Sequence, residues 1–307
     1  MKLLVTGGAG FIGSHITDAL IEKGHEVVVV DNLLMGKLEN VNPKAKFVLM
    51  DIRAKEISKL FSIEKFDAIF HLAAQMDVRK SVEDPIYDAD VNVLGTLNLL
   101  QNAVQHHVKK IIFASTGGAV YGEQHEFPCS EEHPTQPVSP YGITKLTVEK
   151  YLHFYSVEYG LRYVTLRLAN VYGPRQNPHG EAGVVAIFTG KLLSGGEPII
   201  NGDGKQTRDY VYVGDVVEAN LRALEYPEND TFNIGTGIET DVNRIFHLLN
   251  QLTNRNAEER HGPPKPGEQR RSVIDYKKAK RLLGWEPQVS LEEGLKRTVE
   301  FFKTHSV

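Results

Sequence analysis

The chain of 307 residues is 41% hydrophobic and 24% charged, an ordinary globular composition, and it is long enough for one large α/β unit with an appended lobe. Its net charge of −4 gives no reason to expect a nucleic acid or an anionic membrane as partner, and no apolar run approaches the ~20 residues that span a bilayer. The single cysteine, Cys129, excludes an intrachain disulfide and a thiolate cluster for a metal, so we expect a reducing, cytoplasmic setting and no metal site.

Short apolar runs alternate with longer helical patterns through the first half of the chain. Strands are expected at 3–7, 26–31, 46–51, 67–73, 109–115 and 161–170. Helices are expected at 11–24, 92–107 and 141–160, the first and the last of them ending at a glycine. Strands that are apolar throughout are typical of burial on both faces, and their alternation with helices predicts an α/β fold with a doubly wound parallel sheet, the Rossmann arrangement.

The composition changes after about residue 173, where glycine, proline and polar residues become frequent. We therefore expect a Rossmann domain over 1–173 and a second, smaller lobe, for the substrate, formed mainly by 174–307. The segment 211–225 leaves open a return of residues 211–236 to the first domain.

The first predicted strand leads into the glycine-rich run VTGGAGFIG, which opens the first predicted helix. Gly10 and Gly13, together with Gly7 or Gly8, have the spacing that allows a tight turn and a close approach of the backbone to a pyrophosphate at the helix N-terminus. The second strand ends in Asp31, where a carboxylate would bond an adenosine ribose and repel a 2′-phosphate. Strand, glycines, helix and acid in this order predict a dinucleotide site that prefers NAD to NADP.

The run SPYGITKL places Tyr141 and Lys145 four residues apart, on one face of the last predicted helix. Both side chains are protonated at neutral pH in water, but an adjacent ammonium group favours the phenolate and so makes a tyrosine a general base. The same spacing also occurs on surface helices in which the tyrosine packs and the lysine is solvated. These two residues alone leave both interpretations open.

A set of short motifs accompanies these two sites along the chain. The motifs are TGGAGFIG (6–13), DNLLMG (31–36), DIR (51–53), HLAAQ (71–75), VNVLGT (91–96), VYGE (120–123), SPYGITK (139–145), LRLANVYGPR (166–175) and TRDYVYVGD (207–215). In this set the sequence resembles the extended short-chain dehydrogenase/reductases, and within them the nucleotide-sugar epimerases and dehydratases. The resemblance covers nearly the whole chain and favours the catalytic interpretation of Tyr141 and Lys145.

The resemblance implies that tightly bound NAD is the cofactor. The cofactor-binding residues that it implies are Gly7, Gly10, Phe11, Ile12, Gly13, Asp31, Asn32, Gly36, Asp51, Ile52, Leu72, Ala73, Ala74, Ser115, Tyr141 and Lys145. Among these, Asp51 and Ile52 would flank the adenine, whereas Leu72 and Lys145 would approach the nicotinamide half. Asn92 would be structural and would bond backbone groups near the active site.

The type of reaction follows, by the same resemblance, from the residues after the fifth strand. The related dehydratases have an acidic pair there that serves elimination, whereas this chain has Gly118 and Ala119. What remains is hydride removal and return: Tyr141 takes the proton of a sugar 4-hydroxyl, C4 gives its hydride to NAD, and the 4-keto sugar receives it back on its other face. The resemblance therefore implies C4 epimerisation of a UDP-hexose, glucose and galactose with room for their N-acetylated forms, and a place in galactose metabolism.

The hydroxyl that usually bonds the sugar 4-oxygen would fall on Gly117, so it must come from Thr116 or Ser115 by a local shift. We favour Thr116 as the catalytic residue beside Tyr141 and Lys145, although both hydroxyls could instead satisfy backbone groups at the strand end. The substrate-binding residues that the resemblance implies are Thr116, Asn170, Arg208, Lys265 and Ser272.

Ser272 occupies a position that lies beside the C2 substituent of the sugar in the epimerases, where a tyrosine would crowd the pocket. The resemblance also implies a homodimer in which residues 92–107 and 141–158 of two copies pack as a four-helix bundle. Two alternatives stay open. One is an epimerase or reductase that acts on another nucleotide sugar, and the other, which the intact Tyr141 and Lys145 disfavour, is a non-catalytic NAD-binding regulator.

Overall fold

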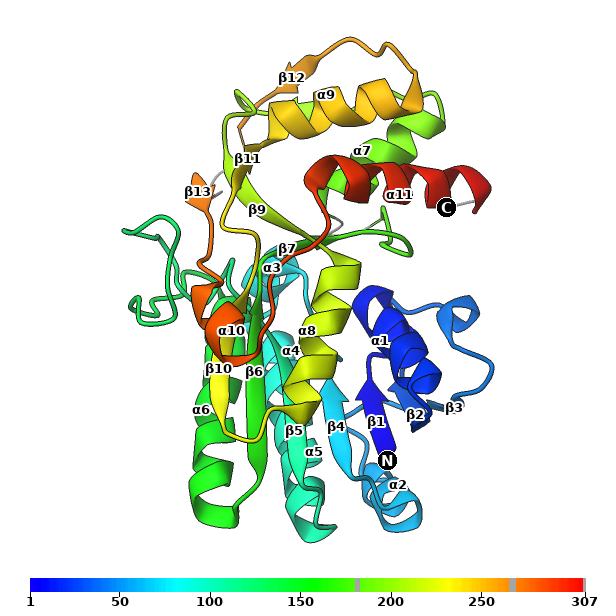
Figure 1. The fold of residues 1–307 in the computed structure, drawn as a ribbon, viewed down its shortest axis with the longest axis vertical. Helices are drawn as coiled ribbons and strands as arrows, with labels where there is room; N and C mark the ends of the chain where they lie inside the picture. Colours follow the sequence, from blue (N-terminus) through cyan, green and yellow to red (C-terminus); the bar gives the residue numbers. More distant parts are fainter. Residues whose placement is uncertain (180–182, 265–268, 306–307) are drawn as a thin grey trace.

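The structure, a computed structural model, describes residues 1–179, 183–264 and 269–305 (Figure 1). Its largest element is a seven-stranded parallel sheet with the strand order β10-β6-β5-β4-β1-β2-β3. The strands are β1 (Lys2–Thr6), β2 (Glu26–Asp31), β3 (Lys46–Leu49), β4 (Ala68–His71), β5 (Lys110–Thr116), β6 (Arg162–Leu168) and β10 (Asp230–Ile234). Consecutive residues alternate between two apolar cores, with Leu3 and Val5 in one and Leu4 in the other.

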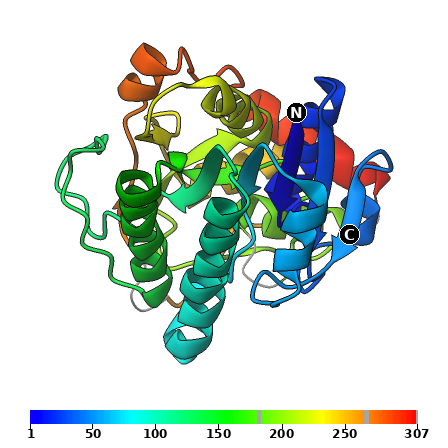
Figure 2. The same cartoon turned by 90° about the horizontal axis from the view of Figure 1, so that it is seen from below.

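Helices cover both faces of this sheet. On one face lie α1 (Phe11–Glu22) and α8 (Val213–Glu225), and on the other lie α2 (Ile57–Glu64), α5 (Gly95–Gln105) and α6 (Pro140–Tyr159). Figure 2 shows α5 and α6 running side by side. The predicted α/β fold with a doubly wound parallel sheet is confirmed. The two predicted terminal glycines, Gly24 and Gly160, have positive φ values of 82° and 70°, which only glycine adopts without strain.

A smaller group of elements lies beyond the carboxyl edge of the sheet, at the top of Figure 1. It contains β7 (Asn170–Tyr172), α7 (Val184–Leu193), β8 (Ile199–Asn201), β9 (Thr207–Tyr212), β11 (Glu239–Asp241), α9 (Val242–Thr253), β12 (Arg260–Gly262), β13 (Arg271–Ser272) and α11 (Leu291–Thr304). β9 pairs with β7, β11 and β13, and β8 pairs with β12. The helices α7, α9 and α11 enclose a third apolar core around Phe188, Phe246 and Val299. We call this group the second lobe.

Shorter helical segments connect the strands of the large sheet. They are a 3-10 turn at Leu38–Asn40, α3 (Val78–Glu83), α4 (Pro85–Ala89) and a π-helical turn at Asp90–Leu94, which leads directly into α5. Of the helices in the described ranges, none has both the length and the apolar stretch that a membrane span would need.

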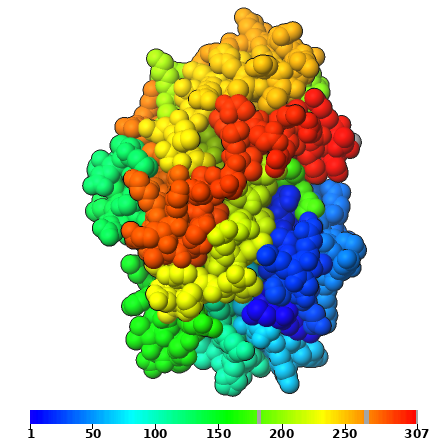
Figure 3. Space-filling view, in the orientation of Figure 1, coloured from blue at the N-terminus to red at the C-terminus, as the bar shows by residue number. Residues whose placement is uncertain are grey.

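The C-terminal half of the chain returns twice to the large sheet. Between β9 and β11, helix α8 packs against α1, and β10 pairs with β6. After β13, α10 (Lys277–Leu282) packs against β10, and Figure 3 shows this segment at the surface next to α8. Trp285 is buried there and donates its indole N–H to the carbonyl oxygen of Asp215 at 2.8 Å. These contacts attach the second lobe to the sheet.

The segment predicted as one strand at 161–170 is in fact two. β6 ends at Leu168, and β7 begins at Asn170 and pairs with β9 instead of continuing in the large sheet. The break therefore carries the chain out of the sheet and into the second lobe at the edge where β5 and β6 end. The polar residues that follow β7 border the carboxyl edge of the large sheet, where the glycine turn between β1 and α1 also lies.

Candidate active site

A cleft of about 1060 Å³ lies between the carboxyl edge of the large sheet and the second lobe. Its walls come from the ends of β1, β2, β4 and β5, from the start of α6, and from β7 and β9. With the exception of Ser272, every predicted site residue that the structure describes lines this cleft. These residues are Gly7, Gly10, Phe11, Ile12, Gly13, Asp31, Asn32, Gly36, Asp51, Ile52, Leu72, Ala73, Ala74, Ser115, Thr116, Tyr141, Lys145, Asn170 and Arg208.

The glycine turn after β1 comes so close to its neighbours that side chains would not fit. Gly7 has a φ of +73°, and a Cβ on it would lie 2.7 Å from the backbone nitrogen of Ala73. A Cβ on Gly13 would overlap the carbonyl oxygen of Gly7. Gly10 is the N-cap of α1 and has no side chain with which to cap the helix. The first turn of α1 lines the cleft, so its N–H groups fit an anion such as a pyrophosphate.

Asp31 holds the far side of the glycine turn. One of its carboxylate oxygens accepts a hydrogen bond from the backbone N–H of Ala9 at 3.0 Å, and the other accepts one from Leu33 at 2.8 Å. A Cβ on Gly36 would lie 2.9 Å from this carboxylate. Asp31 is buried but borders the cleft. Its acceptor oxygens fit the hydroxyls of a ribose beside the turn.

A second carboxylate, Asp51, borders the same end of the cleft. Arg53 donates to its two oxygens at 2.9 and 2.8 Å, and Asn32 donates to it at 3.0 Å. The hydrogen bonds from Arg53 hold the pKa of the Asp51 carboxyl well below its usual range. This carboxylate is therefore charged and fixed next to Ile52, at the end of the cleft that we expect to hold an adenine.

A buried histidine that the sequence analysis did not predict fixes the end of β4. Thr96 donates its hydroxyl to Asn92, so His71 Nε2 must donate to Thr96 Oγ1, at 2.8 Å. His71 Nδ1 then accepts from Thr6 Oγ1 at 2.7 Å. Burial lowers the pKa of His71 to about 3, in agreement with this neutral form. The same Thr6 oxygen accepts from the backbone N–H of Ala73 at 3.3 Å, which positions the wall of the cleft.

Helix α6 begins at the wall of the cleft because Ser139 caps it and Pro140 occupies its first turn. Tyr141 and Lys145 therefore lie on its first two turns and border the cleft. Lys145 Nζ donates to the carbonyl oxygen of Ala114 at 2.9 Å and lies 5.7 Å from the centroid of the Tyr141 ring. The structure thus brings the phenol and the ammonium group together at the cleft.

The charge of Lys145 depends on its burial. The residue is 4% exposed. Burial lowers its pKa to about 8, while the negative charges of Asp88 and Glu149 act in the opposite direction. Below this pH the side chain is an ammonium ion, and its charge favours the phenolate form of Tyr141 over the phenol.

A buried polar network supports α6 from the side of β5 and β6. Glu149, one turn after Lys145, accepts from Arg167 at 3.1 and 2.7 Å and from the Ser115 hydroxyl at 2.6 Å. Arg167 also donates to the hydroxyl of Tyr121 at 2.9 Å. The sequence carries one signal for this network, since Glu149 continues the four-residue spacing of the helix. Its partners come from distant segments, and no local pattern indicates them.

The two candidate hydroxyls at the end of β5 differ in their contacts. Ser115 is 4% exposed and donates its hydroxyl to Glu149. Thr116 lines the cleft, and its hydroxyl lies 3.8 Å from the position that a Cβ on Gly118 would take. Both residues line the cleft, but the Ser115 hydroxyl already donates to Glu149, so the geometry favours Thr116 for contact with a bound substrate.

Asn92 forms the backbone hydrogen bonds expected of it. It accepts from the N–H of Gln75 at 2.8 Å and donates to the Gln75 carbonyl oxygen at 2.9 Å. It also donates to Asp88, which is fully buried and accepts from Gln75 and Thr144 as well. These bonds tie the segment after β4 to the turn of α6 that carries Lys145.

The predicted substrate-binding residues lie at different depths. Asn170 on β7 and Arg208 on β9 border the cleft. Ser272 pairs with Arg208 across β13 and β9, but it is 3% exposed and is not among the described residues that line the cleft. Its hydroxyl lies 3.9 Å from the Cβ position of Gly118. Lys265 lies outside the described residues.

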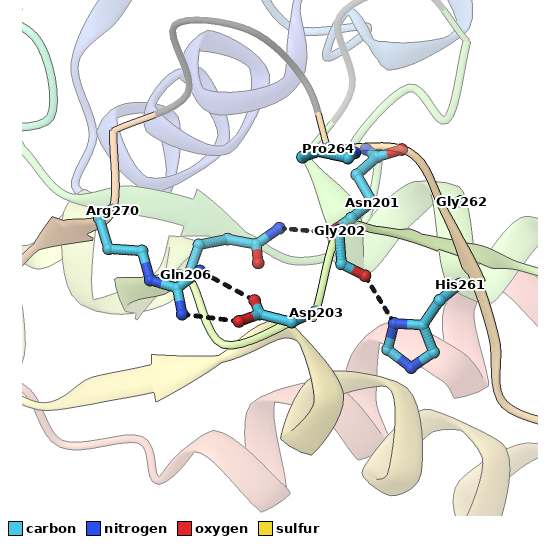
Figure 4. A pocket seen from close by; sticks show the side chains of 8 residues that line it. All are labelled: Asn201, Gly202, Asp203, Gln206, His261, Gly262, Pro264 and Arg270. Carbon is cyan, nitrogen blue, oxygen red and sulfur yellow. Dashed lines mark hydrogen bonds and ion pairs between the residues drawn. The ribbon is translucent and has the colours of Figure 1, made fainter.

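A second cavity, of about 680 Å³, lies in the second lobe (Figure 4). Asp203 and Arg270 form a two-pronged ion pair at its edge, with distances of 2.8 and 2.9 Å, and His261 contacts the Gly202 carbonyl oxygen at 2.7 Å. Gln206 borders both this cavity and the main cleft, so the two are neighbours. Among the residues that the structure describes, no group of three or more His, Cys, Asp or Glu side chains is placed to hold a metal ion.

A family model described as the NAD-dependent epimerase/dehydratase family matches residues 3–235. The chain belongs to this family. The predicted family and its dependence on NAD are therefore confirmed, and the glycine turn, with the space that its missing side chains leave, fits a dinucleotide.

Proteins of the same family resemble the chain over its whole length. The UDP-glucose 4-epimerase of Mycolicibacterium smegmatis is 46% identical to it, with 100% of each chain covered. The solved structure of the Thermotoga maritima UDP-glucose 4-epimerase with UDP-glucose is 55% identical, covers 99% of each chain and has a TM-score of 0.97. The Thermus thermophilus UDP-glucose 4-epimerase in complex with NAD is 45% identical, covers 100% of each chain and has a TM-score of 0.95.

Replacement of Asp31 with alanine is expected to relax the preference of the cofactor site for NAD over NADP. The carboxylate would bond the adenosine ribose of NAD and would repel the 2′-phosphate of NADP. Its removal therefore weakens the binding of NAD without weakening that of NADP in parallel. Dissociation constants for both cofactors, measured by calorimetry on the parent and on the Asp31→Ala and Asp31→Asn variants, check this. Equal affinity of the unmodified protein for the two cofactors would contradict the assignment.

Turnover is expected to fall as the pH rises through about 8, because Lys145 loses its proton there and Tyr141 loses the adjacent positive charge. The contribution of Lys145 to stability has the opposite sign. Between about 8 and the ordinary value of 10.5 the unfolded chain binds this proton more tightly, so folding becomes more favourable as the pH rises. A guanidinium stays protonated in this range, so Lys145→Arg should move the alkaline limb of the kcat profile upward. An unchanged limb in an active Lys145→Arg enzyme would exclude Lys145 as its origin.

Proposed function

We propose that this protein is a UDP-glucose 4-epimerase, which interconverts UDP-glucose and UDP-galactose with bound NAD. The observation that carries the proposal is the strand end that meets the cleft beside Tyr141 and Lys145. It offers the hydroxyl of Thr116 but, at Gly118 and Ala119, no acid that could serve an elimination. The full-length similarity to three UDP-glucose 4-epimerases supports it.

In this proposal the residues of the cleft transfer the proton of the sugar 4-hydroxyl and hold the sugar ring. NAD supplies a hydride acceptor and donor at C4 of the sugar. Tyr141, as phenolate, takes the proton of the 4-hydroxyl while Lys145 stabilises its charge, and Thr116 bonds the same oxygen. The resulting 4-keto sugar turns over within the cleft, and Tyr141 returns the proton to the oxygen as the hydride returns to the opposite face of C4.

The nucleotide half of the substrate would lie along the second lobe. Asn170 and Arg208 border the cleft where we expect the diphosphate, and Lys265 stays a prediction for the same group. Gln206 stands between the cleft and the second cavity, which gives the uracil end room beyond Arg208.

In this proposal the two groups of elements bind different ligands. Residues 1–173, with 211–236 returning to them, would bind NAD, and residues 174–307 would mainly bind the nucleotide sugar. The position of α8 against α1 and of β10 beside β6 supports the return. A reducing, cytoplasmic setting, expected from the single cysteine, stays a prediction as well.

The test is an assay of the purified protein with UDP-galactose and with UDP-glucose, with the products separated by chromatography. Each substrate should yield the other. Tyr141→Phe should keep its NAD and its affinity for UDP but lose turnover by about 10²- to 10⁴-fold, the usual share of a general base. No conversion by the parent, or a Tyr141→Phe variant within twofold of the parent, would reject the proposal.

The proposed substrate range includes the N-acetylated pair, because position 272 carries a small side chain beside Gly118. We expect activity on UDP-GlcNAc and UDP-GalNAc as well, and Ser272→Tyr should abolish this activity before it affects the hexose pair. One misplaced group in a pocket of this kind is worth about 10- to 200-fold. The measurement is the ratio of kcat/KM for the two pairs, before and after the substitution. An unchanged ratio would remove Ser272 from the substrate site.

A homodimer is proposed through α5 and α6, because apolar side chains lie exposed on and beside these helices. Ile143 is 51%, Phe154 48% and Val157 72% exposed on α6, and Leu94, just before α5, is 57% exposed. Two such faces, related by a twofold axis, would bury each other as a four-helix bundle.

Light scattering at micromolar concentration should therefore give the mass of a dimer. Phe154→Glu should yield a monomer, because it places a charge in the centre of the interface. The matched control is Ile238→Glu, at a residue that is 62% exposed and directly precedes β11, and it should stay dimeric. A monomeric parent would contradict the proposed assembly.

A further inference from the structure

Two consecutive glycines, Gly117 and Gly118, directly follow Thr116, the last residue of β5, which lines the cleft. Only one of the two positions has a packing reason to be glycine. A Cβ on Gly117 would lie 2.8 Å from Cδ1 of Ile274, which is buried, so packing excludes a side chain there. The φ of Gly118 lies outside the left-handed region, and the nearest atoms to a Cβ on it would be 3.8 Å away. Neither backbone strain nor packing therefore requires a glycine at position 118.

The space in front of Gly118 is bordered by three polar groups from three different strands. Its Cβ position lies 3.8 Å from Thr116 Oγ1 on β5, 3.9 Å from Asn170 Oδ1 on β7 and 3.9 Å from Ser272 Oγ on β13. Thr116 and Asn170 line the cleft, whereas Ser272 is buried and is not among the described residues that line it. A side chain at position 118 would thus point into the region where these groups converge.

We propose that Gly118 is a specificity-determining residue for the sugar. By having no side chain, it keeps open the space among Thr116, Asn170 and Ser272, and a substituent of the hexose ring fills that space. The three groups that border it are two hydroxyls and an amide, so they can bond a hydroxyl or an acetamido group without burying a charge. This inference rests on the proposed epimerase function and assigns the position that sets the size limit of its substrate.

The inference predicts a loss that grows with the size of the sugar. The variants are Gly118→Ala and Gly118→Val, and the matched control is Gly190→Ala, in α7, where the nearest atoms to the added Cβ belong to Pro178, at 3.5 and 3.8 Å. Each is assayed with three substrates: UDP-xylose, which has no C6 group, UDP-glucose and UDP-GlcNAc. In Gly118→Val, kcat/KM should fall most for the largest sugar, by at least about tenfold more than for the smallest, and Gly118→Ala should show the same order with smaller factors.

A role that is merely structural would give a different result. The melting temperature, the NAD content and the Kd for UDP, which lacks the transferred pyranose ring, should stay those of the parent in both Gly118 variants. The control should leave all three kcat/KM values unchanged. An equal loss for every sugar, no loss at all, or weaker binding of UDP would overturn the inference.

The same variants separate this inference from the proposed function. A parent that converts none of the UDP-sugars would reject the epimerase proposal. Calorimetric Kd values for the three UDP-sugars, relative to UDP, would then still test Gly118. Affinities that decline with sugar size in Gly118→Val but not in the parent support the size limit, and unchanged relative affinities reject it.

Discussion

The burial of one ammonium group, that of Lys145, is the constraint on which the rest of the site depends. A charge removed from water is costly unless opposite charges and acceptors surround it. Here the Ala114 carbonyl oxygen accepts from it at 2.9 Å, and the carboxylates of Asp88 and Glu149 oppose the effect of burial on its pKa. Both carboxylates are held by further buried partners, so the buried ammonium group is linked to a large part of the surrounding polar structure.

The two carboxylates belong to two different networks around α6. Asp88 accepts from the neutral side chains of Gln75, Asn92 and Thr144 and so connects the helix to the segment after β4. Glu149 accepts from Arg167 and Ser115 and so connects it to β5 and β6.

A buried ion pair such as that of Glu149 and Arg167 is often no more stabilising than apolar residues of equal volume, yet removing one partner costs about 3–5 kcal/mol. We infer that this ion pair serves to position α6 rather than to stabilise the fold. It holds the helix that carries the base in register with the strand that carries Thr116.

How much the sequence could predict depended on how local the interactions are. The glycine turn and Asp31 lie within one strand-helix-strand unit, so residue type and spacing together predicted a dinucleotide site there. The spacing of Tyr141 and Lys145 placed both on one helical face but left their role open, and only the resemblance along the whole chain favoured the catalytic interpretation. The bonds of His71 to Thr6 and Thr96 join residues 65 and 25 positions apart, and no local pattern indicates them.

The second lobe was harder for the same reason. The break between β6 and β7 depends on pairing with β9, about 40 residues further on, rather than on any turn signal at the break itself. The burial of Ser272 follows from its pairing beside Arg208, and its depth could not be predicted from the loop sequence. By contrast, the sequence shows that position 118 lacks the acid of the related dehydratases, and only the structure shows that the space in front of Gly118 is open.

In the proposed epimerisation, C4 loses its hydrogen as hydride and regains the same one within a single site. The direct measurement uses UDP-galactose that carries deuterium at C4, in ordinary water, with mass spectrometry of the UDP-glucose formed. The product should retain the deuterium, because the hydride passes to bound NAD and back without contact with solvent. Loss of the label to water would contradict it, since it would mean that C4 exchanges its hydrogen as a proton and not as a hydride.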